Sequence, residues 1–382
     1  MKIIKNANVV TEYGILWDGS VKLEGDSILE VKKANEMEIP SDAEIIDAEG
    51  TYVGPGLVDI HVHGALGITT YYDTEKVANY FLEHGTTSFL AGVEYPLNFE
   101  KFMRALNMTR DMMESGKVPS LKGIYAEGPY INPEYGAYAE RNPWKGPICE
   151  EEYRALVDAG GACVKAWTIA PEREGIEAFM MYARKVNPDV HFALGHSQAT
   201  PEQIRALGVL KPDILTHAMC ATGRAPVPDG TRGCGPDEYC LSEPDMFAEL
   251  ICDSCAIHVN ADMQRLLISI KGVNKMILIT DSTSECHEVP EEMKHITDLN
   301  FDYQGGLSGS RLTMDMACKN IMTHTSCGIV QAFLMGALNP AKAIGMDQEI
   351  GSIAPGKKAD IIFVDDQFNV KKVILQGKLC AF

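Results

Sequence analysis

Two histidines one residue apart, His61 and His63, end an apolar segment and could bind one metal ion together. In a β-strand, residues i and i+2 point to the same face, so both imidazole rings can converge just beyond the carboxyl end of the strand. Imidazole is the commonest metal ligand in proteins, but two histidines on a surface strand can equally be structural. The doublet therefore predicts a metal site only together with further ligands elsewhere in the chain.

Further residues that bind metal ions or move protons follow other apolar segments. Each lies at or directly after the end of a predicted strand: Glu127, His196, His217, His258 and Asp281. The carboxyl ends of parallel barrel strands meet at one rim, where barrel enzymes have their active sites. Any one of these histidines could be structural, but the whole set at matching ends predicts a metal-dependent active site.

Eight apolar segments alternate with helical patterns, which is typical of parallel strands joined by crossover helices. The predicted strands are 57–63, 87–93, 121–127, 164–170, 191–196, 214–219, 256–260 and 276–281. Helical patterns between them include 74–84, 99–114, 151–159 and 176–185. After His196, a helix is predicted to begin with Thr200 as N-cap, Pro201 at its first position and Gln203 completing a capping box. The pattern favours an α/β fold, a closed (β/α)8 TIM barrel.

Both ends of the chain carry short, alternating, glycine-punctuated segments that predict antiparallel strands. They lie at 2–6, 15–23, 27–31 and 45–46 and again at 351–365 and 370–379. We expect the two ends to pair into one small β-sandwich domain, 1–54 plus 346–382, beside a barrel of 55–345. A chain of 382 residues suits such a barrel with an accessory domain.

Composition limits the partners and the compartment. With 34 Lys and Arg against 53 Asp and Glu, the formal net charge of -19 argues against nucleic acid or an anionic membrane as a partner. No apolar segment is long enough to span a bilayer, and no signal-peptide pattern follows Met1. Eleven scattered cysteines, an odd number, fit a reducing compartment better than a disulfide framework. We therefore expect a globular, cytoplasmic protein.

The segments PGLVDIHVHG at 55–64 and GSIAPGKKAD at 351–360 resemble the opening and closing signatures of the amidohydrolase superfamily. Finer matches resemble the N-acetylglucosamine-6-phosphate deacetylases over nearly the whole chain: 123–131, 165–172, 195–200, 216–217, 278–281 and 339–345. Residues 221–256 follow that family poorly. The resemblance implies a TIM barrel, deacetylation of an N-acetyl amino sugar, and a homodimer in which loops of one subunit reach the pocket of the other.

Matching positions carry site roles over to this chain. The resemblance implies a main metal site of three ligands: Glu127, His196 and His217. Asp281 would be the catalytic base and then the catalytic acid. Some members lack the first His-x-His and bind one ion, whereas this chain retains His61 and His63, so one or two divalent ions are expected.

The residue types agree with that chemistry. An unactivated amide resists attack by neutral water. A divalent ion with nitrogen and carboxylate ligands lowers the pKa of bound water toward about 7 and polarises the carbonyl. Asp281 could then take the proton of the water and deliver it to the leaving nitrogen. Zinc is expected first, with iron or manganese as alternatives, because all three suit imidazole and carboxylate ligands.

Two substrate positions depart from the family pattern, since Cys220 replaces an asparagine and Tyr138 a histidine. A phosphate group requires cationic or backbone donors. The candidate cations are Arg141, Lys145, Arg224 and Arg232, although each could be a solvated surface charge. The predicted substrate-binding residues are His258, Tyr138, Cys220, Ala221, Arg224, Arg232 and Leu307. We expect an N-acetyl amino sugar as substrate, with N-acetylglucosamine 6-phosphate first.

Two alternative classes remain open. Another enzyme of the superfamily, acting on a cyclic amide, a dipeptide, a deaminated base, another N-acyl compound or an unphosphorylated amino sugar, would keep every metal ligand and differ in its loops. A non-catalytic scaffold would have lost ligands, and none is missing.

Two further motifs allow a metal or redox interpretation. The spacing of Cys252 and Cys255 is that of a zinc knuckle or redox pair, but one such pair favours buried apolar cysteines. Lys165 would correspond to a lysine that bridges two metal ions in related hydrolases, and Glu127 makes that bridge unnecessary.

Overall fold

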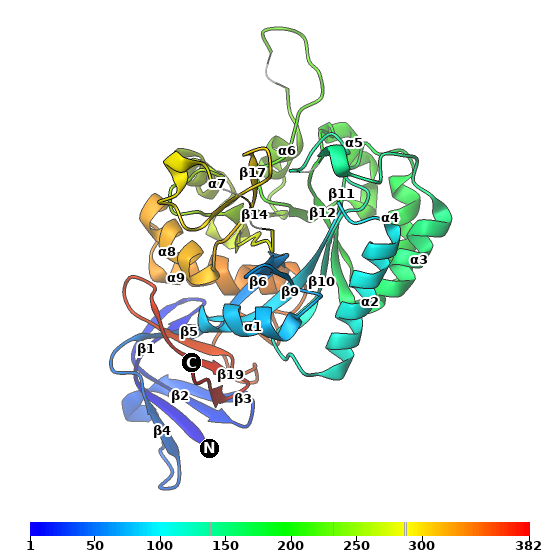
Figure 1. Cartoon of the computed structure of the whole chain (residues 1–382). Coiled ribbons are helices and arrows are strands. Elements are labelled where there is room, and N and C mark those ends of the chain that lie inside the picture. The colour runs from blue at the N-terminus through cyan, green and yellow to red at the C-terminus, as the bar shows by residue number, and fades with distance from the viewer. Residues whose placement is uncertain (138, 232, 286, 288) are drawn as a thin grey trace.

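The computed structural model describes residues 1–137, 139–231, 233–285, 287 and 289–382. Its centre is a parallel sheet of eight strands, ordered β15-β14-β13-β12-β11-β10-β9-β6 (Figure 1). The strands are β6 (Leu57–Val62), β9 (Thr86–Glu94), β10 (Leu121–Glu127), β11 (Val164–Ile169), β12 (His191–Leu194), β13 (Ile214–Leu215), β14 (Phe247–Ile251) and β15 (Met276–Ile279). Neighbours along the chain are neighbours in the sheet, as the TIM-barrel prediction requires.

Hydrogen bonds past the strand ends close the barrel between β15 and β6. The backbone N–H of Asp281 donates to the carbonyl of His61 over 2.9 Å. Below this bond, the Thr280 hydroxyl donates to the buried Asp59 carboxylate over 2.6 Å. The closure therefore places the last strand end beside the His-x-His segment, although the two are far apart in the sequence.

Helices cover the outside of the barrel at the predicted places. The first four are α1 (Thr74–Glu83), α2 (Phe99–Ser115), α3 (Glu150–Gly160) and α4 (Ile176–Val186), of which α2, α3 and α4 lie together on one side in Figure 1. The next, α5 (Pro201–Ala206), begins at the predicted capping box between Thr200 and Gln203. The remaining helices are α6 (Pro236–Ser242), α7 (Ala261–Lys271), α8 (Met314–Thr325), α9 (Ile329–Phe333) and α10 (Asn339–Ala343). On α2, the buried residues recur at helical spacing, which fixes the face toward the strands.

The seventh strand is not at 256–260, so that prediction was wrong. The strand is β14, and the predicted segment belongs to the loop after it. In this loop the buried Asp253 carboxylate accepts three backbone N–H groups, those of Cys255, Ile257 and His258. A side chain that satisfies these donors replaces strand pairing. His258 consequently lies in a loop and not at a strand end.

The chain ends pair into one mixed sheet, ordered β20-β19-β18-β5-β1-β2-β3, with β4 paired to β1. Its strands are β1 (Lys2–Thr11), β2 (Gly14–Glu24), β3 (Ser27–Lys33), β4 (Glu44–Asp47), β5 (Tyr52–Pro55), β18 (Ile361–Val364), β19 (Val370–Leu375) and β20 (Lys378–Leu379). The antiparallel pairing of β18 with β5 joins the end of the chain to its beginning. The predicted small β domain is confirmed, while the bounds 1–54 plus 346–382 and 55–345 stay a prediction.

Two short hairpins extend the barrel strands. They are β7 (Gly64–Ala65) with β8 (Ile68–Thr69), after β6, and β16 (Leu299–Phe301) with β17 (Leu307–Ser310), after β15. The second hairpin returns to the strand ends, where the backbone N–H of Ser310 donates to the carbonyl of Asp281 over 2.8 Å.

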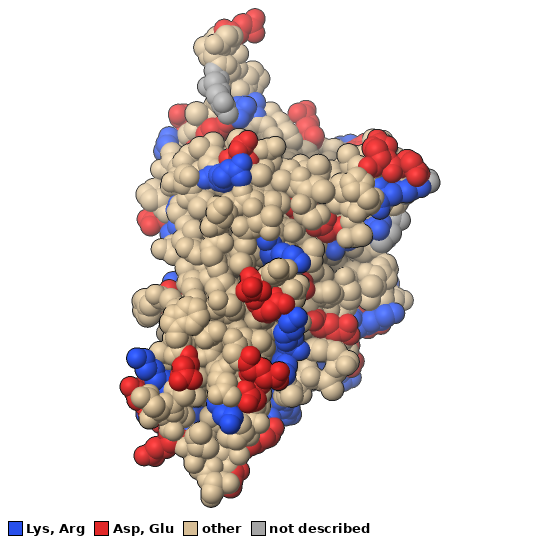
Figure 2. Space-filling model, turned by 90° about the vertical axis from the view of Figure 1, so that its left-hand side faces the viewer, with Lys and Arg blue, Asp and Glu red and all other residues tan. Residues whose placement is uncertain are grey.

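One face of the molecule carries charged side chains of both signs. On the face drawn in Figure 2, Lys and Arg side chains are interspersed with Asp and Glu side chains. This face therefore offers no single basic stripe to a polyanion. Among the described helices, none is both long and apolar enough to cross a membrane.

Candidate metal centre

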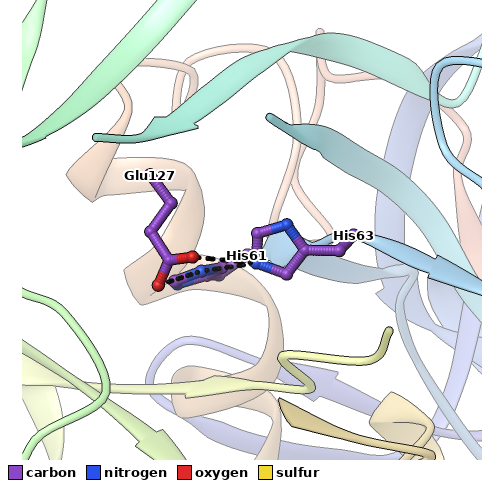
Figure 3. A group of neighbouring side chains, drawn as sticks. All are labelled: His61, His63 and Glu127. Atoms are coloured by element: carbon purple, nitrogen blue, oxygen red, sulfur yellow. Dashed lines mark hydrogen bonds and ion pairs between the residues drawn. The ribbon is translucent and has the colours of Figure 1, made fainter. Parts of the chain in front are cut away.

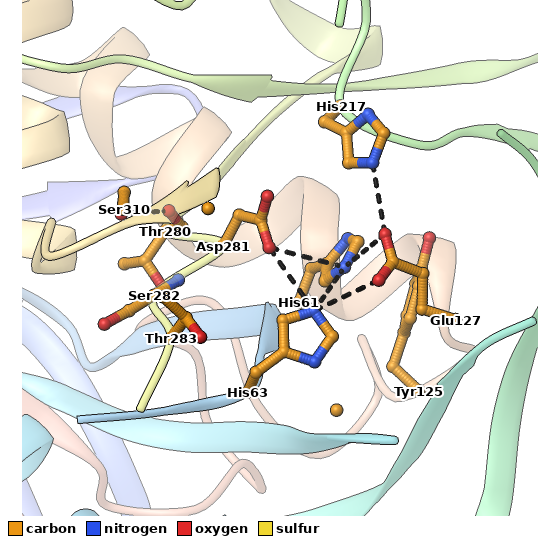
Figure 4. Close-up of polar contacts among 12 residues, drawn as sticks. His61, His63, Tyr125, Glu127, His217, Thr280, Asp281, Ser282, Thr283 and Ser310 are labelled. Atoms are coloured by element: carbon orange, nitrogen blue, oxygen red, sulfur yellow. Dashed lines mark hydrogen bonds and ion pairs between the residues drawn. The ribbon is translucent and has the colours of Figure 1, made fainter. Parts of the chain in front are cut away.

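Six predicted site residues meet at the carboxyl ends of the barrel strands: His61, His63, Glu127, His196, His217 and Asp281. Three are on or directly after β6 and β10, and the other three follow β12, β13 and β15 by no more than two residues. Each is at most 9% exposed. Figure 4 shows most of this group, with Asp281 on one side of His61 and His63 and with Glu127 on the other.

The first cluster contains His61, His63 and Glu127 (Figure 3). The Nε2 atoms of the two histidines are 3.2 Å apart, and they lie 3.6 Å and 3.4 Å from the carboxylate oxygens of Glu127. Two nitrogens bound to one tetrahedral zinc ion at about 2.0 Å lie roughly 3.3 Å apart. The spacing and the donor types therefore fit one divalent ion.

The second cluster shares Glu127 and adds His196 and His217. Oε1 of Glu127 lies 2.8 Å from Nε2 of His196 and 3.2 Å from Nε2 of His217, and the two imidazole nitrogens are 3.1 Å apart. This set also fits a divalent ion. Glu127 belongs to both clusters and would therefore be a ligand common to the two sets.

Asp281 adjoins the first cluster. Its Oδ1 atom lies 3.3 Å from Nε2 of His63 and 3.8 Å from Nε2 of His61. Burial acts to raise the pKa of Asp281, but the neighbouring imidazoles outweigh it and hold the pKa below its ordinary value. The side chain is therefore an ionised carboxylate that can accept a proton.

The rings and carboxylates of the centre alter one another's protonation. Burial lowers the pKa of His63, but Asp281 and Glu127 together raise it to about 8. Burial prevails at His196, whose pKa lies below its ordinary value. Burial acts to raise the pKa of Glu127, yet the surrounding imidazoles hold it well below the usual range. Binding an ion at the first cluster must consequently displace a proton near neutral pH.

Backbone turns aim three of these side chains into the mouth of the barrel. His196, His217 and Asp281 have φ angles of 48°, 29° and 47°. For residues other than glycine this left-handed region costs on the order of 1–3 kcal/mol and is typical of functional sites. A neighbouring glycine gives the space that His63 needs, because a Cβ on Gly92 would lie 2.5 Å from Nδ1 of that ring.

A cavity of about 280 Å³ adjoins the metal clusters. Its floor includes His63, Glu127, His196, His217 and Asp281. Its wall includes four of the predicted substrate residues, Cys220, Ala221, His258 and Leu307, and the apolar Ala137, Met219 and Ile251. No Lys or Arg of the described chain lines it.

Comparison with known proteins agrees with this geometry. The sequence pattern of the amidohydrolase family matches residues 52–380. The chain belongs to the amidohydrolase family. This amidohydrolase is 27% identical to the N-acetylgalactosamine-6-phosphate deacetylase of Escherichia coli O157:H7, over 100% of this chain and 99% of that protein.

Two further proteins are similar to this amidohydrolase over nearly its whole length. The N-acetylglucosamine-6-phosphate deacetylase of Bacillus subtilis (strain 168) is 26% identical, over 99% of this chain and 96% of that protein. The crystal structure of the N-acetylglucosamine-6-phosphate deacetylase from Pasteurella multocida covers 100% of both chains with a TM-score of 0.88 and 24% identity. The latter likeness shows a common fold.

His258 lines the cavity of this amidohydrolase from the loop after β14. Its Nδ1 lies 3.1 Å from the carboxylate of Asp253, and its Nε2 lies 3.1 Å from the carbonyl of Gly309. Both ring nitrogens therefore face oxygen acceptors. The ring is thus held at the cavity wall with a defined orientation.

The remaining predicted polar contacts are not part of the described cavity lining. Tyr138 and Arg232 are outside the described residues. Arg224 is not among the residues that line the cavity, and its guanidinium pairs with Glu238. The guanidinium of Arg141 stacks over the ring of Tyr303 at 4.3 Å, and the Lys145 ammonium donates to the carbonyl of Glu140. A contact of any of these cations with substrate stays a prediction.

Cys252 and Cys255, the two cysteines with zinc-knuckle spacing, form no metal-binding group with other described residues. Cys252 is buried, and its thiol lies 3.3 Å from Oε1 of Gln264, whereas Cys255 is exposed. Both described clusters that could hold an ion consist of histidine and glutamate. The apolar interpretation therefore fits Cys252 but not Cys255.

Two acidic residues of the centre were missed by the sequence analysis. Glu94 ends β9 and lines the cavity, and burial raises its pKa to about 7. Its place at a strand end is the signal that could have identified it. Glu249 lies inside β14, fully buried, with its carboxylate against His61. An acidic residue within a short apolar segment was the signal that could have identified it.

Proposed function

We propose that this amidohydrolase removes the acetyl group from an N-acetyl amino sugar, with N-acetylglucosamine 6-phosphate as the first candidate substrate. The observation that supports this proposal is the convergence of two histidine–glutamate clusters and the Asp281 carboxylate at the floor of one cavity. The full-length similarity to deacetylases of 6-phosphorylated amino sugars supports the substrate class.

The floor residues would hold one or two divalent ions, with zinc expected first and iron or manganese as alternatives. His61 and His63 would hold one ion and His196 and His217 the other, with Glu127 between them. Such an ion lowers the pKa of water toward about 7 and polarises the amide carbonyl.

Asp281 would move the proton. Its ionised carboxylate lies beside the first cluster, where it would accept the proton of the attacking water as general base. The same group then protonates the nitrogen of the departing amine, so that acetate and the free amino sugar leave as products. His258, held between Asp253 and Gly309, would orient the acyl or sugar part of the substrate from the wall.

A second candidate is an unphosphorylated N-acyl substrate. It is favoured by the absence of Lys and Arg from the described cavity lining, because a phosphate needs cationic or backbone donors. Arg232, a predicted substrate residue, lies outside the described residues. A contact between its guanidinium and a phosphate would favour the first candidate instead.

The compartment and the oligomeric state of the protein are also part of this proposal. We propose a cytoplasmic homodimer, in which loops of one subunit reach the pocket of the other. The segment before α6, which projects from the barrel in Figure 1, is the candidate loop, and it carries Arg224. Tyr138, Cys220 and Ala221 would belong to the same substrate-binding region.

Acetate release from four sugars tests the proposal: N-acetylglucosamine 6-phosphate, N-acetylgalactosamine 6-phosphate and the two unphosphorylated sugars. Simple cyclic amides serve as the comparison class. We expect turnover of at least one amino sugar and its loss in an Asp281→Asn variant that keeps its metal. Higher kcat/KM for an unphosphorylated sugar would select the second candidate, and turnover of cyclic amides alone would reject both.

A further inference from the structure

Glu249 is a buried carboxylate in the middle of β14 that contacts both metal clusters. Its side chain is fully buried. Oε2 lies 3.1 Å from Nδ1 of His61 and 3.2 Å from the backbone nitrogen of His217. Oε1 has no hydrogen-bond partner among the described residues. A buried carboxylate is costly unless it is well paired, so its position calls for a specific role.

The contact with His61 determines which ring nitrogen can bind an ion. A carboxylate only accepts hydrogen bonds, so Nδ1 carries the proton that Glu249 accepts. In the neutral ring Nε2 then keeps its lone pair, and this atom faces His63 and Glu127. The ring of Tyr125 stacks on His61 with the centroids 4.3 Å apart, which opposes a flip of the imidazole.

The contact with His217 stabilises a strained turn of the second cluster. The backbone N–H of His217, a residue with a φ of 29°, donates to the same Oε2 atom. The main chain of Glu249 adds a second restraint, because its carbonyl accepts the N–H of Ala218 over 2.8 Å. The carboxylate of Glu249 contacts only the backbone of His217, but it contacts the imidazole ring of His61, which would bind the ion.

We propose that Glu249 is a positioning residue that makes the first cluster a complete metal site, so that this chain binds two divalent ions. The proposal rests on the proposed metal centre and specifies how its first half is formed. Glu249 itself touches no ion. It fixes the orientation and tautomer of His61, as carboxylates behind metal-binding histidines generally do.

Zinc titration of the full-length protein tests this role, with metal content measured after removal of free ion. Glu249→Leu replaces the carboxylate by an apolar group of similar volume. We expect the wild type to bind two equivalents and the variant one, with affinity at the first cluster reduced by about 10- to 100-fold. Glu249→Gln retains one acceptor oxygen and should recover part of the loss.

Tyr125→Phe is the matched control. The tyrosine hydroxyl lies 3.0 Å from the Thr216 hydroxyl, and its ring touches the same histidine. The control removes a buried polar atom beside His61 but keeps the stacked ring, and we expect it to bind two equivalents. Two equivalents with wild-type affinity in a folded Glu249→Leu protein would overturn the proposal.

A measurement on the wild type covers the case in which the variants fail to fold. Nitrogen NMR of the zinc-loaded, 15N-histidine-labelled protein should show Nδ1 of His61 protonated and Nε2 bound to metal. The reverse assignment would overturn the proposal. Both experiments read metal binding alone, so a lack of activity toward amino sugars would reject the proposed function without affecting this result.

Discussion

The floor and the wall of the cavity are built in different ways. The floor consists of five of the site residues, with His61 directly behind them; all six lie on or within two residues of barrel strands and are at most 9% exposed. The wall consists of Cys220, Ala221, His258, Leu307 and apolar neighbours, which come mainly from loops and from β17. Strand ends fix geometry, whereas loops vary more easily. The floor should therefore determine the reaction, and the wall should determine the substrate.

The largest effect is expected at Glu127, the carboxylate that both clusters share. In Glu127→Gln the side chain keeps its shape but loses its charge, so neither cluster keeps its full ligand set. We expect metal content to fall from two equivalents toward zero and kcat/KM to fall by about 10³-fold or more, roughly 4 kcal/mol. Metal analysis and acetate release measure the two effects.

Glu94→Gln is the matched control for that loss. Glu94 lines the same cavity but belongs to neither cluster. Its variant should keep both ions. Equal metal loss in the two variants would mean that acidity of the cavity in general, and not the bridging position of Glu127, holds the ions.

A smaller loss is expected at Asp281, which should move protons without holding the ion. Asp281→Asn removes the base while the ring and carboxylate donors of both clusters remain. We expect kcat to fall by about 10²- to 10⁴-fold, with metal content unchanged and KM altered by less than about threefold. Loss of metal in this variant would instead show that Asp281 is needed to hold the ion.

A wall variant should change binding while leaving the reaction intact. Leu307 lines the cavity from β17 and is 36% exposed, so part of its contact area remains in water. We expect Leu307→Ala to raise KM by roughly fivefold, about 1 kcal/mol, with kcat and metal content unchanged. Val209→Ala, at a residue 93% exposed outside the cavity, is the control and should change neither constant. A large fall in kcat would contradict the separation of floor from wall.

The same division explains how much the sequence could predict. His61, His63 and Asp281 could be identified because an alternating or strand-end position fixes a side chain's direction in any parallel barrel. The capping box at Thr200 could be identified because its bonds join neighbouring residues. Such local rules cover most of the fold and the predicted part of the floor.

Residues whose positions depend on distant partners could not be predicted in this way. Glu249 lies 188 positions along the chain from His61, which it contacts, and the strand that carries it was not predicted. The orientation of His258 depends on Asp253 and on Gly309, 51 positions away. Four wall residues were predicted from the family resemblance, but the contacts that orient them were not, because loop contacts have no period that a sequence can display.

The smallest effect is expected on the free energy of unfolding, at a histidine–carboxylate pair away from the cavity. This pair shows how much such a contact stabilises the protein where no metal site is involved. His84, at the end of α1, lies 3.2 Å from the carboxylate of Asp315 on α8. The hydrogen bond to Asp315 raises the pKa of His84 above its ordinary value of 6.5. A histidine whose pKa is raised by folding stabilises the protein fully below the unfolded pKa, and the contribution is lost as pH rises through the folded pKa.

His84→Asn should therefore reduce the free energy of unfolding at pH 6 more than at pH 9, by less than about 1 kcal/mol because the pair is partly exposed. Urea unfolding of both proteins at the two pH values measures this difference. The contributions of titratable groups that both proteins share cancel when the two are compared. Metal content should be unchanged, in contrast to every histidine of the clusters. An equal loss of stability at pH 6 and pH 9 would mean that packing against α8, and not the charge of the ring, is what His84 contributes.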